Sequence, residues 1–372
     1  MNRYLPAALA FTAYLVQTPV AATQFNQTNL VTDDQAVNAA QITDPSLVNA
    51  WGISRGPATG PATPFWVSNN GTGTSTVYSV NPTTQATSKA ALTVTIPGAG
   101  NPTGQAFGSG SSFNKDIFTF VSEDGTVSGW RGDLGTTAEI LSAGSVNNVY
   151  KGVARGTVGA NDYMYAANFH TGAVDVVKGS AAAPNITGSF TDPNLPAGFA
   201  PFNVANLGGS LFVTYAQQDA AKHDDVAGLG HGFVDEFDLN GNLVKRLATG
   251  GALNSPWGLA IAPSSFGTLA GSLLVGNFGD GHITGFDLTT GNFLGQLLDK
   301  NGQPLAIDGL WGLISGNDGD GGSSQSIYFA AGPGGETHGL FGVINAVPVP
   351  AALPLLLSGL PLLRLARRRE HA

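Results

Sequence analysis

The side chains with the richest chemistry gather in one stretch, residues 217–232, with the sequence QQDAAKHDDVAGLGHG. It contains Asp219, His223, Asp224, Asp225 and His231. Carboxylate oxygens and imidazole nitrogens are groups with which proteins hold divalent cations, so these five residues are candidate metal ligands. Their spacing matches no established zinc or calcium motif. The alternative is a solvated loop whose aspartates cap its own turns.

A repeat of about fifty residues must position this loop. Six copies open with related short strands, which begin at Trp51, Thr103, Lys151, Phe202, Trp257 and Trp311. Each continues as short runs rich in apolar, β-branched and aromatic residues between turn signals, and glycine makes up 52 of the 372 residues, which suits tight turns. About four strands per copy at this period is typical of a β-propeller. We therefore predict an all-β, six-bladed β-propeller with four-stranded blades over residues 25–345.

The last repeat supplies only three strands of its own, whereas one isolated strand, Phe25–Val31, precedes the first repeat. We expect this N-terminal strand to complete the last blade, because such a closure removes an exposed sheet edge. In the same scheme the loop at 217–232 lies between the second and third strands of blade four. Long loops in compact domains are often functional.

Three tryptophans, Trp51, Trp257 and Trp311, open a blade immediately before a glycine. Blades one, five and six are neighbours in a six-membered ring, so the three indoles should lie close together. One interpretation is that they pack between blades near one end of the channel. The other is that they form an aromatic rim that stacks on sugar rings or other flat apolar surfaces.

A second set of polar residues follows or opens inner strands of the predicted blades: Asn69, Glu123, Asn168, Asn203 and Asn277. Such a set could hold a metal in the central channel of a hydrolase. The amides also have a simpler role as turn residues, and a single acidic member is little charge for a divalent ion. No Gly-x-Ser-x-Gly elbow is present, and nothing marks one serine as a nucleophile. The sequence therefore nominates no catalytic residue.

The N-terminal segment has the pattern of a secretory signal peptide. Arg3 precedes an apolar run from Leu5 to Val16, and small residues stand before a predicted cleavage point after Ala22. The chain contains no cysteine, so export would not depend on disulfides. We assign residues 1–22 to this signal.

The C-terminal segment, residues 347–372, has the sequence VPVPAALPLLLSGLPLLRLARRREHA. Its apolar part is just long enough for a transmembrane helix, and the terminal arginines would remain in the cytoplasm. A Pro-x-Pro-Ala start, an apolar segment and an arginine cluster resemble the PEP-CTERM sorting signal, in its VPLPA-type variant. The resemblance implies an exosortase-type processing partner and a transient membrane anchor. Val349 stands where the name-giving form has glutamate.

The repeat domain carries a second resemblance. The phrases LVNAWGI at 47–53, PFWVSNNGTG at 64–73 and KHDDVAG at 222–228 are similar to those of an uncharacterised family of exported bacterial propeller proteins that often bear this tail. The blades are more loosely similar to NHL and TolB-like six-bladed propellers. The resemblance implies fold and export, with a location at the cell envelope, the outer surface or outside the cell. It brings no established activity.

The net charge of the chain limits the classes of ligand that we expect. The whole chain carries −9, and the part without the predicted signal and tail carries −13, from 11 basic and 24 acidic residues. Such a surface repels nucleic acid and anionic membranes, which leaves neutral glycans, cations and proteins. We favour a non-catalytic binding or extracellular-matrix protein that engages exopolysaccharide. The alternative is a gluconolactonase-like, metal-dependent hydrolase with a divalent cation as its cofactor in the central channel.

Overall fold

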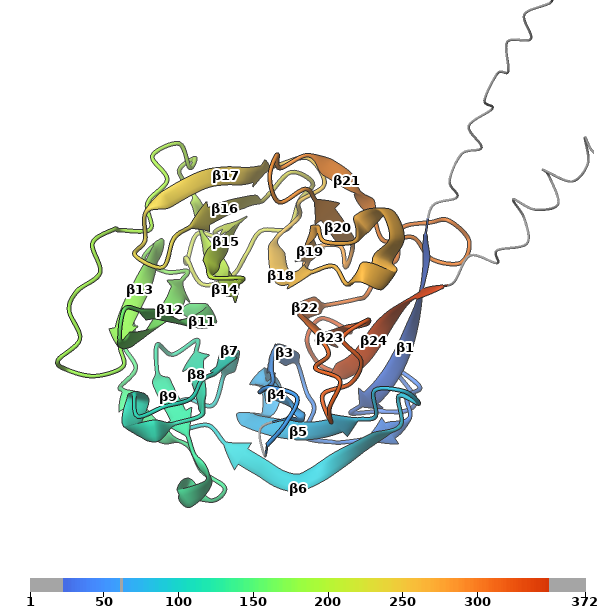
Figure 1. Ribbon diagram of the computed structural model, residues 1–372, viewed down its shortest axis with the longest axis horizontal. Helices are drawn as coiled ribbons and strands as arrows, with labels where there is room; N and C mark the ends of the chain where they lie inside the picture. Colours follow the sequence, from blue (N-terminus) through green and yellow to red (C-terminus); the bar gives the residue numbers. More distant parts are fainter. Residues whose placement is uncertain (1–22, 61–62, 348–372) are drawn as a thin grey trace, which may run out of the picture. The chain divides into compact units, whose positions relative to one another are not determined.

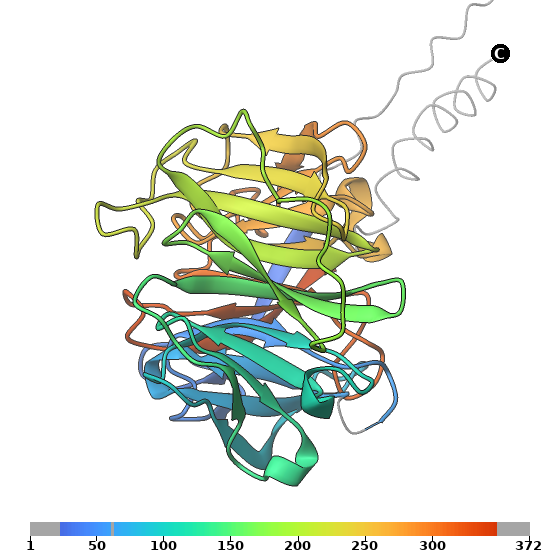
Figure 2. The same ribbon diagram turned by 90° about the vertical axis from the view of Figure 1, so that its left-hand side faces the viewer.

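The computed structural model describes residues 23–60 and 63–347. The predicted signal at 1–22 and all but the first residue of the predicted tail lie outside these ranges. Six small β-sheets stand around a common axis (Figure 1), and Figure 2 shows the same ring from the side. The predicted all-β, six-bladed propeller is confirmed.

The blades follow one another along the chain, and their strands are numbered in chain order. Blade one consists of β3 (Ala50–Ser54), β4 (Phe65–Asn69), β5 (Thr74–Val80) and β6 (Thr87–Thr95). Blade two consists of β7 (Pro102–Phe107), β8 (Phe118–Ser122), β9 (Val127–Trp130) and β10 (Glu139–Ser142). Blade three consists of β11 (Tyr150–Val158), β12 (Asn161–Asn168) and β13 (Ala173–Lys178). Blade four consists of β14 (Phe199–Leu207), β15 (Ser210–Gln217), β16 (Phe233–Phe237) and β17 (Leu243–Thr249).

Blade five consists of β18 (Pro256–Ile261), β19 (Leu273–Asn277), β20 (Ile283–Phe286) and β21 (Phe293–Gln296). Blade six consists of β22 (Leu310–Ser315), β23 (Ile327–Ala331), β24 (Leu340–Val347), β1 (Gln24–Thr32) and β2 (Ile42–Thr43). Four short 3₁₀ turns interrupt the loops: η1 (Asn70–Thr72), η2 (Phe113–Lys115), η3 (Gly132–Leu134) and η4 (Ser264–Leu269). None of the helices in the described ranges is long and apolar enough to cross a membrane.

Two blades differ from the predicted four strands. Blade three has three, because the chain after β13 runs irregularly from 179 to 198. This segment contains Pro184, Pro193 and Pro196, and proline cannot donate a hydrogen bond to a sheet. Blade six has five, because β2 adds to β1 in parallel.

The predicted closure of the ring is confirmed. β1 pairs antiparallel with β24, from Gln24 opposite Val347 to Thr32 opposite Leu340. A bulge between Asn29 and Val31 shifts the register once. Residues from the two ends of the domain therefore share one sheet, and β1 covers the edge that β24 would otherwise expose.

The first strand of every blade faces the axis, and a glycine lets neighbouring first strands approach closely. A Cβ on Gly52 would lie 2.4 Å from the carbonyl oxygen of Thr103, and one on Gly312 would lie 2.8 Å from that of Trp51. The X-Gly pattern at the start of the repeats therefore reflects close backbone contact around the channel.

The hydrophobic core is divided among the blade interfaces. Among the described residues, six clusters of buried side chains each join two neighbouring blades, and a seventh lies on the axis. For example, Trp66 of blade one stacks on Phe118 of blade two with ring centroids 4.1 Å apart. The axial cluster brings Trp51, Trp257 and Trp311 together.

Candidate functional site at the polar mouth of the channel

The axial cluster closes the channel with aromatic rings. Trp311 stacks on Trp51 with centroids 3.6 Å apart, and on Phe278 with centroids 3.8 Å apart. Trp257 meets both indoles edge-on. The exposed fractions of Trp51, Trp257 and Trp311 are 2%, 5% and 1%. The three tryptophans therefore form a buried floor, as the packing interpretation predicts. They are too little exposed to form the aromatic rim of the other interpretation.

Lys151 occupies in blade three the position that tryptophan occupies in blades one, five and six. Its side chain is 2% exposed, and its ammonium lies 5.3 Å from the centroid of Trp51. Nζ donates to Glu123 Oε1 at 2.5 Å and to Asp224 Oδ1 at 3.1 Å. Burial opposes the charge on Lys151, yet the two carboxylates raise its pKa above the ordinary value. The lysine is therefore a buried cation whose neutralising groups come from two other blades.

Hydrogen bonds continue from this ion pair to side chains of neighbouring blades at the same end of the channel. Glu123 Oε2 accepts from Asn70 Nδ2 at 3.0 Å, and Asn70 Oδ1 accepts from Asn49 Nδ2 at 3.3 Å. Asn49 Nδ2 also donates to Glu336 Oε2 at 2.6 Å, and its Oδ1 accepts from Trp311 Nε1 at 3.0 Å. The chain of contacts thus rests directly on the aromatic floor.

We call this group the polar mouth; its members are Asn49, Asn70, Glu123, Lys151, His223, Asp224 and Glu336. They come from five of the six blades. Most lie at the start of a first strand or in the turn between the second and third strands, and these positions share one face of the ring because the strands are antiparallel. The loop at 217–232 belongs to the same set of turns.

Two members of the polar mouth have unusual backbones. Asn49 has φ +47° and Glu336 has φ +66°, in the left-handed region that non-glycine residues rarely adopt. Burial raises the pKa of Glu336, although Asn49 and Lys151 oppose this rise. Strained backbones and desolvated carboxylates are concentrated at functional sites.

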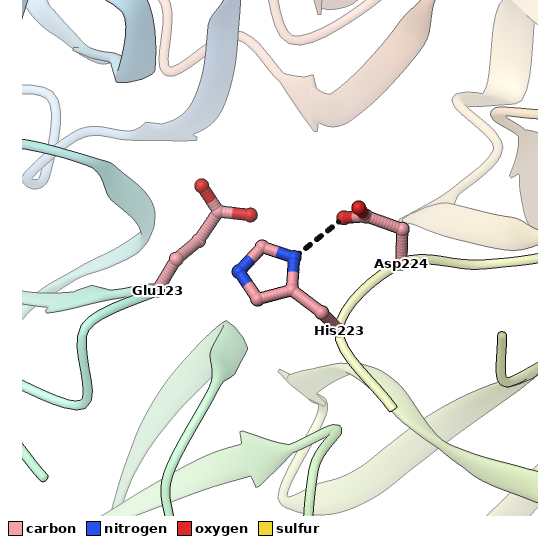
Figure 3. A group of neighbouring side chains, drawn as sticks. All are labelled: Glu123, His223 and Asp224. Atoms are coloured by element: carbon pink, nitrogen blue, oxygen red, sulfur yellow. Dashed lines mark hydrogen bonds and ion pairs between the residues drawn. The ribbon is translucent and has the colours of Figure 1, made fainter. Parts of the chain in front are cut away.

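Three residues of the polar mouth offer ligand types that suit a divalent cation. Figure 3 shows Glu123 and His223 side by side, with Asp224 bonded to His223 Nδ1 at 2.9 Å. One ligand atom from each residue lies within 4.8 Å of the others. However, Glu123 and Asp224 already share the ammonium of Lys151. Burial opposes the charge on Asp224, but this ammonium lowers the pKa of the carboxyl below its ordinary value. A divalent ion at this position would have to displace the lysine.

The structure separates the other predicted ligands of the loop from this group. Asp219 Oδ1 caps the turn by accepting from the backbone N–H of His223 at 2.9 Å. His231 Nδ1 lies 2.9 Å from the carbonyl oxygen of Val226. Burial raises the pKa of Asp225, which lies next to Asp224 but outside the cluster of three.

Of the five polar residues predicted near the inner strands, only Glu123 belongs to the polar mouth. Each of the four asparagines uses its side-chain amide within the scaffold: Asn69 donates to Thr76, Asn168 to Asp175, Asn203 to the carbonyl of Trp257, and Asn277 to the carbonyl of Ala252. These contacts give the amides a structural role.

Sequence reasoning did not nominate Asn49, Asn70, Lys151 or Glu336. The repeat contained a signal for one of them. Lys151 is the only charged residue among the six that open the first strands, four of which are aromatic. The other three stand in turns of ordinary composition, which does not mark them as site residues.

Fold and site together define a six-bladed β-propeller whose channel is closed by aromatic rings beneath a charged, hydrogen-bonded mouth. The chain belongs to a family that includes two uncharacterized proteins of Acanthamoeba polyphaga mimivirus. One is 31% identical over 293 residues, covering 74% of this chain and 70% of the relative. The other is 30% identical over 316 residues, covering 80% of each. No protein-family model matches the chain.

Solved structures resemble this chain in fold alone. An auxiliary nutrient binding protein from Bacteroides thetaiotaomicron has a TM-score of 0.51 at 8% identity, covering 88% of this chain and 78% of that one. A periplasmic gluconolactonase from Pseudomonas aeruginosa has a TM-score of 0.43 at 16% identity, covering 81% and 89%. Both sequence relatives are viral, so the expected bacterial family and its sorting tail stay predictions.

Proposed function

We propose that this protein is an exported, non-catalytic binding protein that holds a neutral or cationic glycan at the polar mouth. The observation that carries the proposal is the continuous chain of hydrogen bonds from Glu336 through Asn49, Asn70 and Glu123 to Lys151. Carboxylates and amides fixed in this way are suited to sugar hydroxyls, because their orientation is set before the ligand arrives.

Charge favours the same class of ligand. Glu123, Asp224 and Glu336 bring three carboxyl groups to the mouth against the single ammonium of Lys151. A polyanion would be repelled there, as it would by the acidic surface as a whole. Phe278 stacks on Trp311 and is partly exposed, so it adds an aromatic edge to the polar groups.

The described residues do not form a serine–histidine or threonine–histidine nucleophile pair. In the ranges 23–60 and 63–347, no serine or threonine hydroxyl forms a hydrogen bond with a histidine ring. The histidine of the mouth, His223, contacts Asp224 instead. An activated nucleophile needs a base within hydrogen-bond reach, and this pairing is missing from the described site.

Export and display are part of the proposal and rest on the two ends of the sequence. The signal pattern at 1–22 supports secretion, and the tail at 347–372 supports processing by an exosortase-type enzyme at the membrane. An exported glycan-binding propeller would then act at the cell surface or in the matrix, where exopolysaccharide is the available ligand.

A titration of the full chain with neutral, amino-containing and uronic-acid oligosaccharides tests this function. We expect binding of the first two classes and rejection of the third. Glu123→Gln and Glu336→Gln should each weaken binding about tenfold, the loss of roughly one charge-assisted hydrogen bond. Asp133→Asn, which removes an exposed carboxylate elsewhere, is the matched control. Failure to bind any neutral or amino sugar would refute the proposal.

A second candidate function is a metal-dependent hydrolase, and the proximity of Glu123, His223 and Asp224 favours it. One imidazole and two carboxylates would hold the ion, which would supply an activated water when bound. The position of Lys151 between the two carboxylates counts against this candidate. Metal analysis after mild chelation and reloading decides between the two candidate functions. A tightly held ion would favour the hydrolase over the glycan-binding protein.

A further inference from the structure

A cavity of about 270 Å³ lies on the other side of the tryptophan floor. Trp257 forms part of its lining, and the first strands of all six blades surround it. Its lining is mixed: the apolar side chains of Ile53, Val153, Val204, Leu259 and Leu313, each 9% exposed or less, alternate with polar ones such as Gln105 and Asn203. The floor separates this cavity from the polar mouth, so the two ends of the channel present different chemistry.

Two arginines are among the residues that line this cavity. Arg55 and Arg155 occupy the same place in the repeat, four residues after Trp51 and Lys151, which corresponds to about 13 Å along an extended strand. The equivalent residue of blade four, Asn206, also lines the cavity. It donates to the carbonyl of Arg155 at 2.9 Å and so holds that strand.

These two arginines differ from the other two in the described part of the chain. Arg131 pairs with Asp116 and Glu139, and Arg246 pairs with Asp192 and Asp235. Within residues 23–60 and 63–347, neither Arg55 nor Arg155 has a carboxylate within ion-pair distance, 4.0 Å. Both guanidinium groups that lack an ion pair therefore line the same cavity, although the protein as a whole has an excess of acidic residues.

Their hydrogen bonds show which one is available to a ligand. Arg55 is fixed to blade six, with Nε donating to the carbonyl of Ser315 at 2.7 Å and Nη2 to that of Gly316 at 2.8 Å. Arg155 lies on the ring of Phe113 and uses Nη1 for the carbonyl of Asp116 at 3.0 Å. A guanidinium has five N–H donors, so most of those on Arg155 are left for another acceptor.

Burial lowers the pKa of both guanidinium groups, although Asp318 and Asp162 act in the opposite direction from farther away. A partly desolvated cation without a counterion is costly. An anion that enters the cavity would reduce this cost, and the apolar side chains of the lining would cover an apolar part of the ligand.

We propose that this cavity binds a small monocarboxylate with an apolar body, its carboxylate against Arg155 with Arg55 nearby and its body against the walls. Carboxylate and guanidinium match in geometry and charge. The site is separate from the polar mouth and does not depend on the function proposed for it.

Calorimetric titration of the full chain with benzoate tests this site, and benzamide and acetate separate its two requirements. We expect benzoate to bind at least tenfold more tightly than benzamide, which lacks the charge, and than acetate, which lacks the apolar body. Arg155→Met should weaken benzoate binding at least tenfold, whereas Arg155→Lys should retain part of it. The matched control Lys178→Met removes an exposed cation of the same blade and should change nothing.

Glu123→Gln at the polar mouth should leave benzoate binding unchanged, which distinguishes this site from the first. Equal affinities of the unmodified protein for benzoate and benzamide would overturn the proposal. Unchanged benzoate binding in a folded Arg155→Met variant would do so as well. If that variant does not fold, the benzoate–benzamide comparison and the Arg155→Lys variant decide the result.

Discussion

Within the polar mouth, the ammonium of Lys151 lies 2.5 Å from Glu123 Oε1 and 5.3 Å from the ring centroid of Trp51. A position that is tryptophan in three other blades holds the one buried cation of the mouth. This cation neutralises Glu123 and Asp224, which would otherwise be free to hold a metal ion. This contact therefore favours the proposed binding of hydroxylated ligands over the binding of a metal ion at the polar mouth.

Removal of that cation should create a metal site. In Lys151→Met, Glu123, His223 and Asp224 no longer have a competing ammonium, so we expect the affinity for Mn²⁺ or Zn²⁺ to rise at least tenfold, as measured by calorimetry. The double variant Lys151→Met, His223→Ala should lose most of this gain. An unmodified protein that already binds either ion as tightly as the variant would contradict the role assigned to Lys151.

The tryptophan floor should be a major source of stability. Trp257 is 5% exposed, and its Nε1 donates to the carbonyl of Lys151 at 2.9 Å. We expect Trp257→Ala to lower the free energy of unfolding by about 3–5 kcal/mol, measured by denaturant titration. Phe293→Ala is the control, because that ring is 57% exposed and should contribute little. A small loss for Trp257→Ala would mean that the indole is accessible after all.

Closure by the N-terminal strand should be essential, and the C-terminal tail should not be. Deletion of residues 23–32 removes β1 and exposes β24, so we expect a strong fall in melting temperature. Deletion of 348–372 removes no residue of the described propeller and should leave the melting temperature nearly unchanged. The opposite ranking of the two truncations would show that the domain boundaries are wrong.

Stability should vary with pH through Asp235. Burial raises the pKa of this carboxyl from 3.8 to about 6, although Arg246 opposes the rise. The folded state thus holds the proton more tightly, so the contribution to stability is complete below about pH 4 and is lost as pH rises through 6. A shift of this size corresponds to about 3 kcal/mol at most. The fall in stability over this pH range should be smaller in Asp235→Asn, whereas Asp133→Asn should keep it in full.

The fold could be predicted from the sequence because each blade repeats the same local pattern. Short apolar runs between glycine-rich turns, at a period of about fifty residues, are enough to identify a propeller. The missing strand of the last repeat and the isolated strand at Phe25–Val31 likewise predicted the closure. In blade three, prolines in the 179–198 segment accompany the absence of a fourth strand, which the repeat alone did not reveal.

The site was only partly predictable. His223 and Asp224 were nominated from their loop and Glu123 from its turn, but as members of two different sets. Only the ring places turns from separate blades, up to hundreds of residues apart, on one face, where Glu336 meets Asn49. Lys151 shows the same limit: its type and position are visible in the sequence, whereas its partners are decided by the closure of the ring. The charge of a side chain can be read from the sequence, but the tertiary structure decides which group neutralises that charge.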